Sequence, residues 1–325
     1  MIHSGTTFFN DMYFFEDEVA RAAKRIGIRA MIGEGILDFP TPSKANPDEA
    51  LNYSENLINK YQNDPLIMVA IAPHSPYTCS TDTLLKAKRL AVKYNVPFHI
   101  HVAETKEEVT TINVKYGLTP VKYLDSLGII DAKLISAHSI WLTEEEITLL
   151  AQKQGGIAHD PESNEKLADG VAPIPQLLAA GAKISLGTDG AASNNNLNLV
   201  EEIDTAAKLH KVVSLNPTVM KAEDLVKMAT IGGAKVLGVD HDLGSIEIGK
   251  KADLLIIDLN RPNLIPVYNY YSMIAYNLNA ADIETVIING KIIMFNHKIK
   301  TINEQTVIND FKRIIKEKTN LAPLL

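Results

Sequence analysis

The chain has 325 residues, of which 46% are hydrophobic and 22% are charged, and its formal net charge is −7. This balance is typical of a globular protein and excludes a disordered tail, a collagen-like fibre and a coiled coil. A single cysteine, Cys79, excludes an internal disulfide and a cysteine-based zinc site, and it favours a reducing, cytoplasmic location.

The charge distribution and the N-terminal residues bear on two classes of partner. No basic stripe interrupts the acidic balance, so we expect no nucleic-acid partner. The N-terminal sequence MIHSGTTFFNDMYFF lacks the basic start, apolar run and cleavage site of a signal peptide. No stretch approaches the roughly 18 apolar residues that span a bilayer. We therefore expect a soluble, cytoplasmic protein without a membrane partner.

Short apolar runs alternate with amphipathic stretches along most of the chain. The runs are rich in Ile, Val, Phe and Thr and are bounded by Gly, Pro or Asn, which is typical of buried strands. They are Thr6–Phe14, Arg29–Leu37, Ile67–Pro73, Pro97–Glu104, Lys133–Ser139, Gly156–Pro161 and Lys183–Asp189. The predicted helices include Glu16–Ile26, Asp48–Gln62, Thr81–Tyr94, Pro120–Leu127, Thr143–Gln152, Pro173–Ala180, Asn198–Val213 and Ala222–Leu237. This alternation predicts a parallel sheet with helices packed outside it.

Polar side chains gather where the predicted strands end, and this favours one parallel architecture over another. Functional groups at the carboxyl ends of successive strands are typical of a TIM-type (β/α)₈ barrel, whereas a doubly wound sheet concentrates its site at one switch point. Seven predicted strands are one fewer than a closed barrel needs. We therefore expect an α/β barrel that lacks one strand. Its open edges, at Thr6–Phe14 and Lys183–Asp189, favour aggregation or strand exchange.

The pattern changes near Gly244. The segments GSIEIGKKADLLIIDL and ETVIINGKIIMFNHKIKT predict short strands, the second with a hairpin turn at Asn289–Gly290. The stretch Glu304–Lys318 predicts a closing helix. We therefore expect two units: a barrel at residues 1–243 and a small β-sandwich appendage with its helix at residues 244–325.

The strongest chemical signal lies at the predicted strand ends. Because strand side chains alternate, His99 and His101 face the same way, and imidazole and carboxylate groups suit Zn²⁺ or Fe²⁺. Glu104, three residues beyond His101, is placed to move a proton. Each residue also has a structural interpretation: a hydrogen-bonded strand histidine, a helix cap at Glu104, or a turn at Asp189. Their joint position on one rim favours the catalytic interpretation.

Six segments then carry a family resemblance. They are APHSPYTCS, IHVAET, ISAHSIWLT, AHDPESNEKLADGVAPI, SLGTDGAASNNNLNL and LGSIEIGKKADLLIIDL. In this order they resemble the metal-dependent amidohydrolase superfamily and, within it, the 5-methylthioadenosine/S-adenosylhomocysteine deaminases. The resemblance covers essentially the whole chain. It implies one divalent metal, zinc or else iron, that activates a water molecule; the water attacks C6 of an adenine ring and ammonia leaves.

The resemblance also implies roles for individual residues. His101 is matched to a metal ligand, and Asp189 to the last metal ligand and the base that accepts the proton of the water. Glu104 is matched to the proton shuttle, which also contacts the substrate, and His138 to the histidine that orients the attacking group. His74 and Ser193 are matched to substrate contacts, His74 near the ribose. The resemblance further implies a small-molecule nucleoside substrate and, since relatives often form dimers or tetramers, a homo-oligomer.

The chain departs from the family pattern in its metal ligands. The family's first barrel strand ends in an HxH pair that supplies two metal ligands, whereas SGTTFFNDMYF resembles the second strand. We therefore expect a chain truncated at its N-terminus, with little or no activity as written. His99 is interpreted as a buried, hydrogen-bonded core residue rather than a replacement ligand, and His159 as a structural residue or a neighbour of the site.

Two further departures concern the substrate. Some relatives that accept S-adenosylhomocysteine carry arginines after the third barrel strand, where this chain has Glu34. Asp160 replaces an asparagine of the family pattern and adds a negative charge. Both weaken the case for an acidic substrate. The alternatives that stay open are 5′-deoxyadenosine or adenosine as substrate, another aminated ring such as aminodeoxyfutalosine, and an inactive remnant without the HxH ligands.

Overall fold

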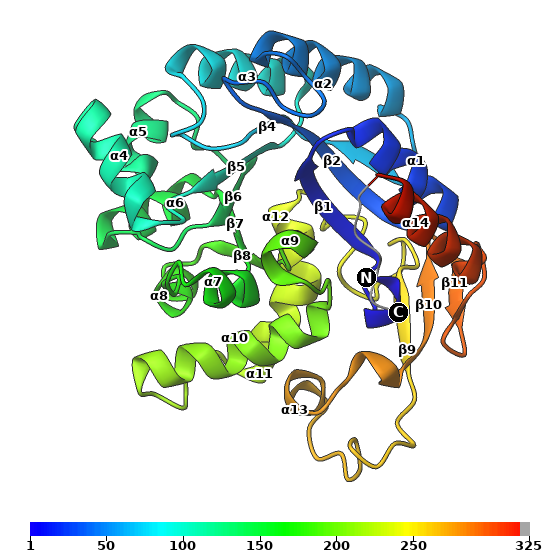
Figure 1. Ribbon diagram of the computed structural model, residues 1–325. Helices are drawn as coiled ribbons and strands as arrows, with labels where there is room; N and C mark the ends of the chain where they lie inside the picture. The colour runs from blue at the N-terminus through cyan, green and yellow to red at the C-terminus, as the bar shows by residue number, and fades with distance from the viewer. Residues whose placement is uncertain (319–325) are drawn as a thin grey trace.

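A curved series of parallel strands forms the centre of the computed structural model, which describes residues 1–318 (Figure 1). The strands are β1 (Phe8–Tyr13), β2 (Arg29–Ile36), β3 (Ile67–Val69), β4 (Ala72–Pro73), β5 (Phe98–Val102), β6 (Leu134–His138), β7 (Gly156–His159) and β8 (Lys183–Leu186). β1, β2 and β3 are neighbours in that order, and β4 continues the line of β3 by pairing with β2. A parallel bridge between Ile71 and Phe98 leads to β5, after which β6, β7 and β8 follow in order. The predicted α/β barrel architecture is confirmed.

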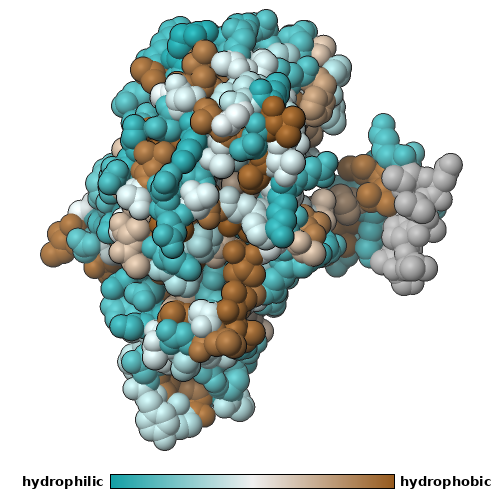
Figure 2. All heavy atoms as spheres, turned by 90° about the vertical axis from the view of Figure 1, so that its left-hand side faces the viewer, coloured by the Kyte–Doolittle hydropathy of each residue, from teal (hydrophilic) through white to brown (hydrophobic). Residues whose placement is uncertain are grey.

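Helices surround this curved sheet, most of them on its outer side (Figure 1). They are α1 (Glu16–Ile26), α2 (Pro47–Tyr61), α3 (Thr81–Tyr94), α4 (Lys106–Tyr116), α5 (Pro120–Ser126), α6 (Glu144–Lys153), α7 (Pro161–Leu167), α8 (Ile174–Ala179), α9 (Ala191–Asn194), α10 (Leu199–Ser214), α11 (Ala222–Lys227) and α12 (Gly233–Val236). A π-helical segment at Met228–Gly232 joins α11 to α12. Hydrophilic residues predominate on the face of α4 and α6, with apolar residues scattered among them (Figure 2).

Both faces of the strands are packed, which explains their nearly continuous apolar sequence. On β2, Ile32 belongs to the large cluster that also holds helix residues such as Leu84. The neighbouring Met31 instead packs with Ile135 and Val236 in a separate, smaller cluster. Because successive strand side chains point to opposite faces, the large cluster lies between strands and outer helices and the small one lies on the inner face.

The two ends of the strand series carry open edges, as the sequence predicts. β1 pairs with β2 and β8 pairs with β7. Within residues 1–318 no strand pairs with the other edge of either one. Unpaired edge groups of this kind are a template for another strand.

The C-terminal part is a four-stranded antiparallel sheet in the order β12–β11–β10–β9. Its elements are β9 (Leu254–Ile257), β10 (Ile283–Ile288), β11 (Lys291–Phe295), β12 (Lys298–Ile299), α13 (Tyr270–Tyr276) and α14 (Glu304–Lys318). Asn289 and Gly290 have φ of 52° and 73°, which confirms the predicted hairpin turn. The strand predicted to start at Gly244 begins only at Leu254. Gly244 and Gly249 have φ of 88° and 96°, so this stretch turns instead of extending.

A buried ion pair joins this sheet to the amino end of β2. Arg29 Nε donates to the Asp253 carboxylate at 2.6 Å, and its guanidinium also donates to the Pro65 carbonyl and to the Asn289 side chain. The proposed second unit, 244–325, extends to residues 319–325, which lie outside the described residues. Among the described helices, none is long and apolar enough to cross a membrane.

Candidate active site

Three histidines meet at the carboxyl ends of the parallel strands. His101 lies on β5, His138 ends β6 and His74 follows β4. The ring centroids of His74 and His101 are 4.8 Å apart, and those of His101 and His138 are 5.4 Å apart. The parallel register of β5 and β6 pairs Val102 with His138, which places the two site histidines on adjacent strands at nearly the same height. The structure therefore places His74, His101 and His138 side by side at one rim.

A backbone contact fixes the orientation of His101. Its Nδ1 lies 2.8 Å from the carbonyl oxygen of His74, so Nδ1–H donates and Nε2 carries the lone pair. Burial, with the neighbouring His138, lowers the pKa of His101 and keeps the imidazole neutral. A neutral imidazole whose other nitrogen donates to a carbonyl is the usual arrangement of a metal ligand.

Asp189 is held as a carboxylate in the turn after β8. The Ser163 hydroxyl donates to it at 2.7 Å and the Gly190 amide donates at 2.5 Å. Burial opposes ionisation, but these donors, together with His138 and His101, lower the pKa of Asp189 below its usual value. Asp189 also has a φ of 55°, a conformation that costs free energy in a non-glycine residue and is often found at functional sites.

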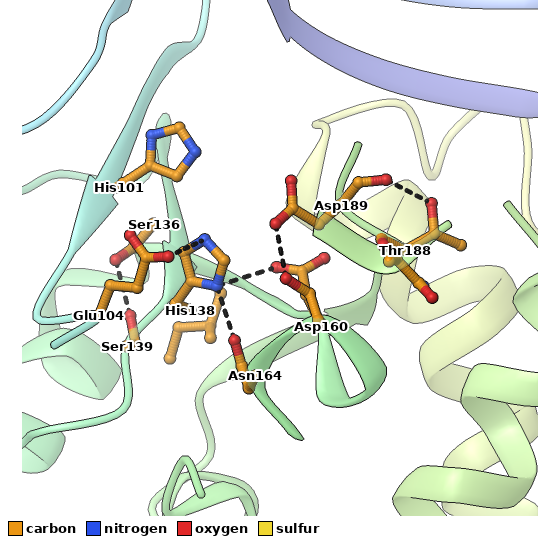
Figure 3. A network of polar contacts seen from close by, with 12 residues as sticks. His101, Glu104, Ser136, His138, Ser139, Asp160, Asn164, Thr188 and Asp189 are labelled. Carbon is orange, nitrogen blue, oxygen red and sulfur yellow. Dashed lines mark hydrogen bonds and ion pairs between the residues drawn. The ribbon is translucent and has the colours of Figure 1, made fainter. Parts of the chain in front are cut away.

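Glu104 points toward His138 across the site (Figure 3). Its Oε1 lies 3.6 Å from His138 Nε2. The backbone that carries it is fixed by Glu108, whose buried carboxylate accepts the amides of Ala103 at 3.0 Å and of Glu104 at 2.8 Å. Ala103 has a φ of 52°, so these two hydrogen bonds stabilise a turn with an unfavourable backbone conformation.

His138 is surrounded by acceptors that favour its charged form. Nδ1–H donates to Asn164 Oδ1 at 2.9 Å, and the Asp160 carboxylate lies 3.8 Å from the same nitrogen. Burial opposes the charge, but Asp160 and Glu104 raise the pKa of His138 above its usual value. Burial, together with the nearby Asp189 and Glu104, raises the pKa of Asp160 to about 6, although His138 acts against it.

The two predicted substrate contacts differ in how the structure places them. His74 lies beside His101, and its Nδ1 contacts the hydroxyl of Thr78 at 3.0 Å. Burial, with His101 and His138, lowers the pKa of His74 to about 4, so it is neutral at physiological pH. Ser193 lies in α9, four residues after Asp189. Within residues 1–318 no side-chain hydrogen bond joins Ser193 to the histidines.

His99 and His159 take other partners. The ring of His99 is 6.0 Å from that of His101, and its Nδ1 contacts Asn10 Nδ2 at 3.1 Å. His159 contacts His210 through the Nε2 atoms at 3.0 Å, and both rings are buried. These contacts agree with the structural interpretation of both residues.

Three residues that fix the site were missed by the sequence analysis: Glu108, Ser163 and Asn164. Glu108 follows Thr105 by three residues, a spacing typical of a helix cap, and its amide is capped by the Thr105 hydroxyl at 3.1 Å. That signal locates the start of α4 and says nothing about the amides of Ala103 and Glu104. Ser163 and Asn164 stand together in PESN, but only the folded chain brings α7 against His138 and Asp189.

The available donors fit a divalent metal in type but not in number. His101 Nε2 and the Asp189 carboxylate are ligands suited to Zn²⁺ or Fe²⁺. Within residues 1–318, however, no group of three or more His, Cys, Asp and Glu side chains is arranged to hold a metal ion. Catalytic zinc usually takes three protein ligands, so His101 and Asp189 account for only part of such a site.

Comparison with models of protein families shows to which family the chain belongs. Residues 1–293 match the model of the amidohydrolase family. The chain belongs to the amidohydrolase family. Among its relatives, a protein of Thermodesulfovibrio yellowstonii named 5-methylthioadenosine/S-adenosylhomocysteine deaminase is 49% identical over 95% of this chain and 70% of its own length. A protein of Methanocaldococcus jannaschii named 5′-deoxyadenosine deaminase is 45% identical over 94% of this chain and 73% of its own.

Solved structures of amidohydrolases agree with the fold. An adenosine deaminase from Xanthomonas campestris with bound zinc superposes with a TM-score of 0.96 at 36% identity, over 98% of this chain and 73% of that one. An atrazine chlorohydrolase from Arthrobacter aurescens complexed with zinc gives a TM-score of 0.90 at 25% identity, over 97% of this chain and 74% of that one. The parallel strands and the outer helices are therefore those of an amidohydrolase barrel.

Proposed function

We propose that this amidohydrolase chain carries catalytic residues for the hydrolytic deamination of an adenine nucleoside. The observation that carries the proposal is the position of His101, Glu104, His138 and Asp189 around one site, at the carboxyl ends of β5, β6 and β8 (Figure 3). The deaminase names of the relatives at 49% and 45% identity support this substrate class. The zinc in the Xanthomonas and Arthrobacter structures supports a divalent metal, and we propose zinc rather than iron.

The proposed chemistry divides between a metal and the side chains. When bound, a divalent metal supplies Lewis acidity toward water; His101 Nε2 and the Asp189 carboxylate are its proposed ligands here. Asp189, held ionised by Ser163 and Gly190, is the proposed acceptor of the proton that the attacking water loses. Glu104 is the proposed shuttle that carries a proton to a ring nitrogen and to the departing amine.

His138 orients the attacking water in this proposal. Its Nδ1–H is engaged by Asn164, so Nε2 is the nitrogen that faces Glu104 and the interior of the site. A raised pKa favours the imidazolium, which stabilises negative charge as it develops on oxygen. His74, neutral and next to His101, and Ser193 are the proposed contacts to the nucleoside, with His74 near the ribose.

The described residues supply only two of the proposed metal ligands. Two ligands are fewer than catalytic zinc usually has, so His101 and Asp189 alone would hold the metal weakly.

We propose that the catalytic unit is residues 1–243, with residues 244–325 as an appendage. We also propose a cytoplasmic location, which the lone cysteine Cys79 supports, since the thiol is buried and free.

The test compares this chain with a fusion in which the family's HxH-bearing first strand and its following helix precede Met1. Ammonia release from 5-methylthioadenosine, 5′-deoxyadenosine and adenosine is measured with added Zn²⁺, and bound metal is measured by mass spectrometry. We expect the fusion to bind one metal and release ammonia, and this chain to be much slower. A fusion that binds metal but deaminates none of the three nucleosides contradicts the proposed function. Equal turnover by both proteins contradicts the ligand assignment.

A further inference from the structure

Glu202, on α10, is a buried carboxyl that the proposed chemistry does not use. The residue is fully buried, and each of its two carboxyl oxygens accepts a hydrogen bond. Oε2 accepts the backbone amide of Glu162 at 3.1 Å, and Oε1 accepts the side-chain amide of Asn194 at 2.7 Å. Because Glu162 lies in α7 and Asn194 lies in α9, one carboxyl contacts two separate segments.

The contact with Glu162 caps the start of α7. Amides in the first turn of a helix have no partner within the helix and take an acceptor from outside it. Asp160 occupies the N-cap position of α7 but makes no side-chain capping bond; its carboxylate lies 3.8 Å from His138 Nδ1 instead. Glu202 therefore supplies from α10 an acceptor that Asp160 does not supply, and Asp160 is left to face His138.

The contact with Asn194 leads to the turn that carries Asp189. Asn194 is buried, and its side-chain nitrogen donates to the Thr188 carbonyl at 2.9 Å as well as to Glu202. An amide nitrogen carries two hydrogens, so it can make both contacts at once. Thr188 directly precedes Asp189, whose backbone conformation, with a φ of 55°, costs free energy. Glu202 therefore helps to hold this turn through Asn194.

The helix α7 and the Asp189 turn also meet directly at the site. Ser163, in α7, donates its hydroxyl to the Asp189 carboxylate at 2.7 Å, and the next residue, Asn164, accepts His138 Nδ1–H at 2.9 Å. The carboxyl of Glu202 thus holds both the helix that contacts these two side chains and the turn that carries one of them. A displacement of either segment changes how Asp189 and His138 lie relative to each other.

We propose that Glu202 is a positioning residue of the proposed deamination site: it fixes α7 and the Asp189 turn relative to each other, and so sets how Asp189 and His138 face the reactants. This inference rests on the proposed function. Loss of the carboxyl leaves the Glu162 amide and the Asn194 side-chain amide without a buried acceptor, which displaces the segments that carry them. Groups that orient a metal ligand are usually needed for full metal affinity.

The protonation state of Glu202 permits a conservative variant. Burial, with the nearby carboxyls of Glu162 and Asp160, raises the pKa of Glu202 to about 9, so the carboxyl is neutral at pH 7. Glutamine has the length of a neutral glutamic acid and keeps one acceptor oxygen. Glu202→Gln should therefore retain much of the positioning, whereas Glu202→Ala removes both contacts.

Zinc affinity and amide exchange test the inference on this chain. The dissociation constant for Zn²⁺ is measured by competition with a chromophoric chelator, and exchange of the Glu162 amide is measured by NMR. We expect Glu202→Ala and Asn194→Ala each to weaken zinc binding by about three- to tenfold, less than the loss of about 10–100-fold that is typical for direct partners of a metal ligand. The double variant should bind zinc about as weakly as Glu202→Ala, because the two residues act in one chain of contacts.

The exchange measurement separates the two contacts of Glu202, and two controls exclude a general loss of stability. The Glu162 amide should exchange at least about tenfold faster in Glu202→Ala but at the parent rate in Asn194→Ala. Glu202→Gln should lie closer to the parent chain than Glu202→Ala does in both measurements. Glu201→Ala, at the neighbouring exposed carboxylate, and Arg29→Leu, which breaks the buried ion pair at the amino end of β2, should both bind zinc like the parent chain.

The outcomes separate this inference from the proposed function. An unchanged zinc affinity in Asn194→Ala, or an unchanged exchange rate of the Glu162 amide in Glu202→Ala, overturns the inference and leaves the deaminase proposal in place. Equal losses of zinc affinity in Glu202→Ala and Arg29→Leu also overturn it, because the effect is then one of stability alone. If Glu202→Ala does not fold, Asn194→Ala decides through its zinc affinity.

A parent chain that binds no zinc contradicts the metal ligands of the proposed function. The exchange of the Glu162 amide then decides the inference by itself. Faster exchange in Glu202→Ala that is restored in Glu202→Gln supports the inference, and exchange at the parent rate in Glu202→Ala overturns it.

Discussion

Glu108 fixes the turn that presents Glu104, the proposed proton shuttle, and replacing Glu108 should destabilise the fold by a calculable amount. Its carboxylate accepts two backbone amides, those of Ala103 and Glu104, at 3.0 and 2.8 Å. The Glu108 side chain is buried, so water cannot readily replace it. Each buried donor left without a partner costs about 1–3 kcal/mol. With two such donors, Glu108→Ala should lower the free energy of unfolding by about 2–6 kcal/mol.

Urea unfolding followed by far-ultraviolet circular dichroism measures this change. The matched control is Glu107→Ala, one residue earlier in the same helical turn, where the side chain is exposed; we expect less than about 0.5 kcal/mol there. Glu108→Gln should fall between the two, because an amide offers a single acceptor oxygen. Hydrogen exchange at the amides of Ala103 and Glu104 should speed up in Glu108→Ala. A loss below about 1 kcal/mol, with those amides still protected, would refute the reasoning.

Two other predictions concern stability. Burial raises the pKa of Glu202 to about 9, whereas in the unfolded chain this carboxyl has its usual pKa near 4.3. Between these pH values the folded chain keeps a proton that the unfolded chain has released, so the free energy of unfolding should fall as pH rises from about 5 to 9. Glu202→Gln should reduce this slope by at most about 1.4 kcal/mol per pH unit. An unchanged slope in urea titrations across this range would contradict the prediction. Arg29→Leu leaves the buried Asp253 carboxylate without its ion-pair partner and should lower the free energy of unfolding by about 3–5 kcal/mol. Thermal and urea unfolding measure this change, and a loss below about 1 kcal/mol would argue against the prediction.

The order of strands and helices could be predicted from the sequence because its apolar periodicity is strong. β2 is predicted at Arg29–Leu37 and found at Arg29–Ile36. The run Ile67–Pro73 is instead divided into β3 and β4, a break that periodicity does not reveal. Near Gly244 the alternating residues Ile246 and Ile248 suggest a strand. Both isoleucines are exposed, and the glycines on either side adopt positive φ.

The candidate site, like the fold, could be predicted only in part. Residues at strand ends, such as His101 and His138, could be placed together because parallel strands bring their carboxyl ends to one rim. Supporting contacts from helices could not. Asn164 reaches His138 from α7, and Ser163 reaches Asp189, through packing that leaves no periodic signal. The preference of the site for one protonation state of His138 depends on these contacts and on Asp160.

The central claim is that Glu104 moves protons in a deamination for which His101 and Asp189 hold the metal. The most direct measurement is 5-methylthioadenosine turnover by the HxH fusion carrying Glu104→Gln, together with its zinc content, beside the parent fusion and the Glu107→Gln control. The account predicts an unchanged zinc content, a turnover lower by about 10²–10⁴-fold in Glu104→Gln, and parent-like turnover in Glu107→Gln. Undiminished turnover in Glu104→Gln at full zinc content would contradict it.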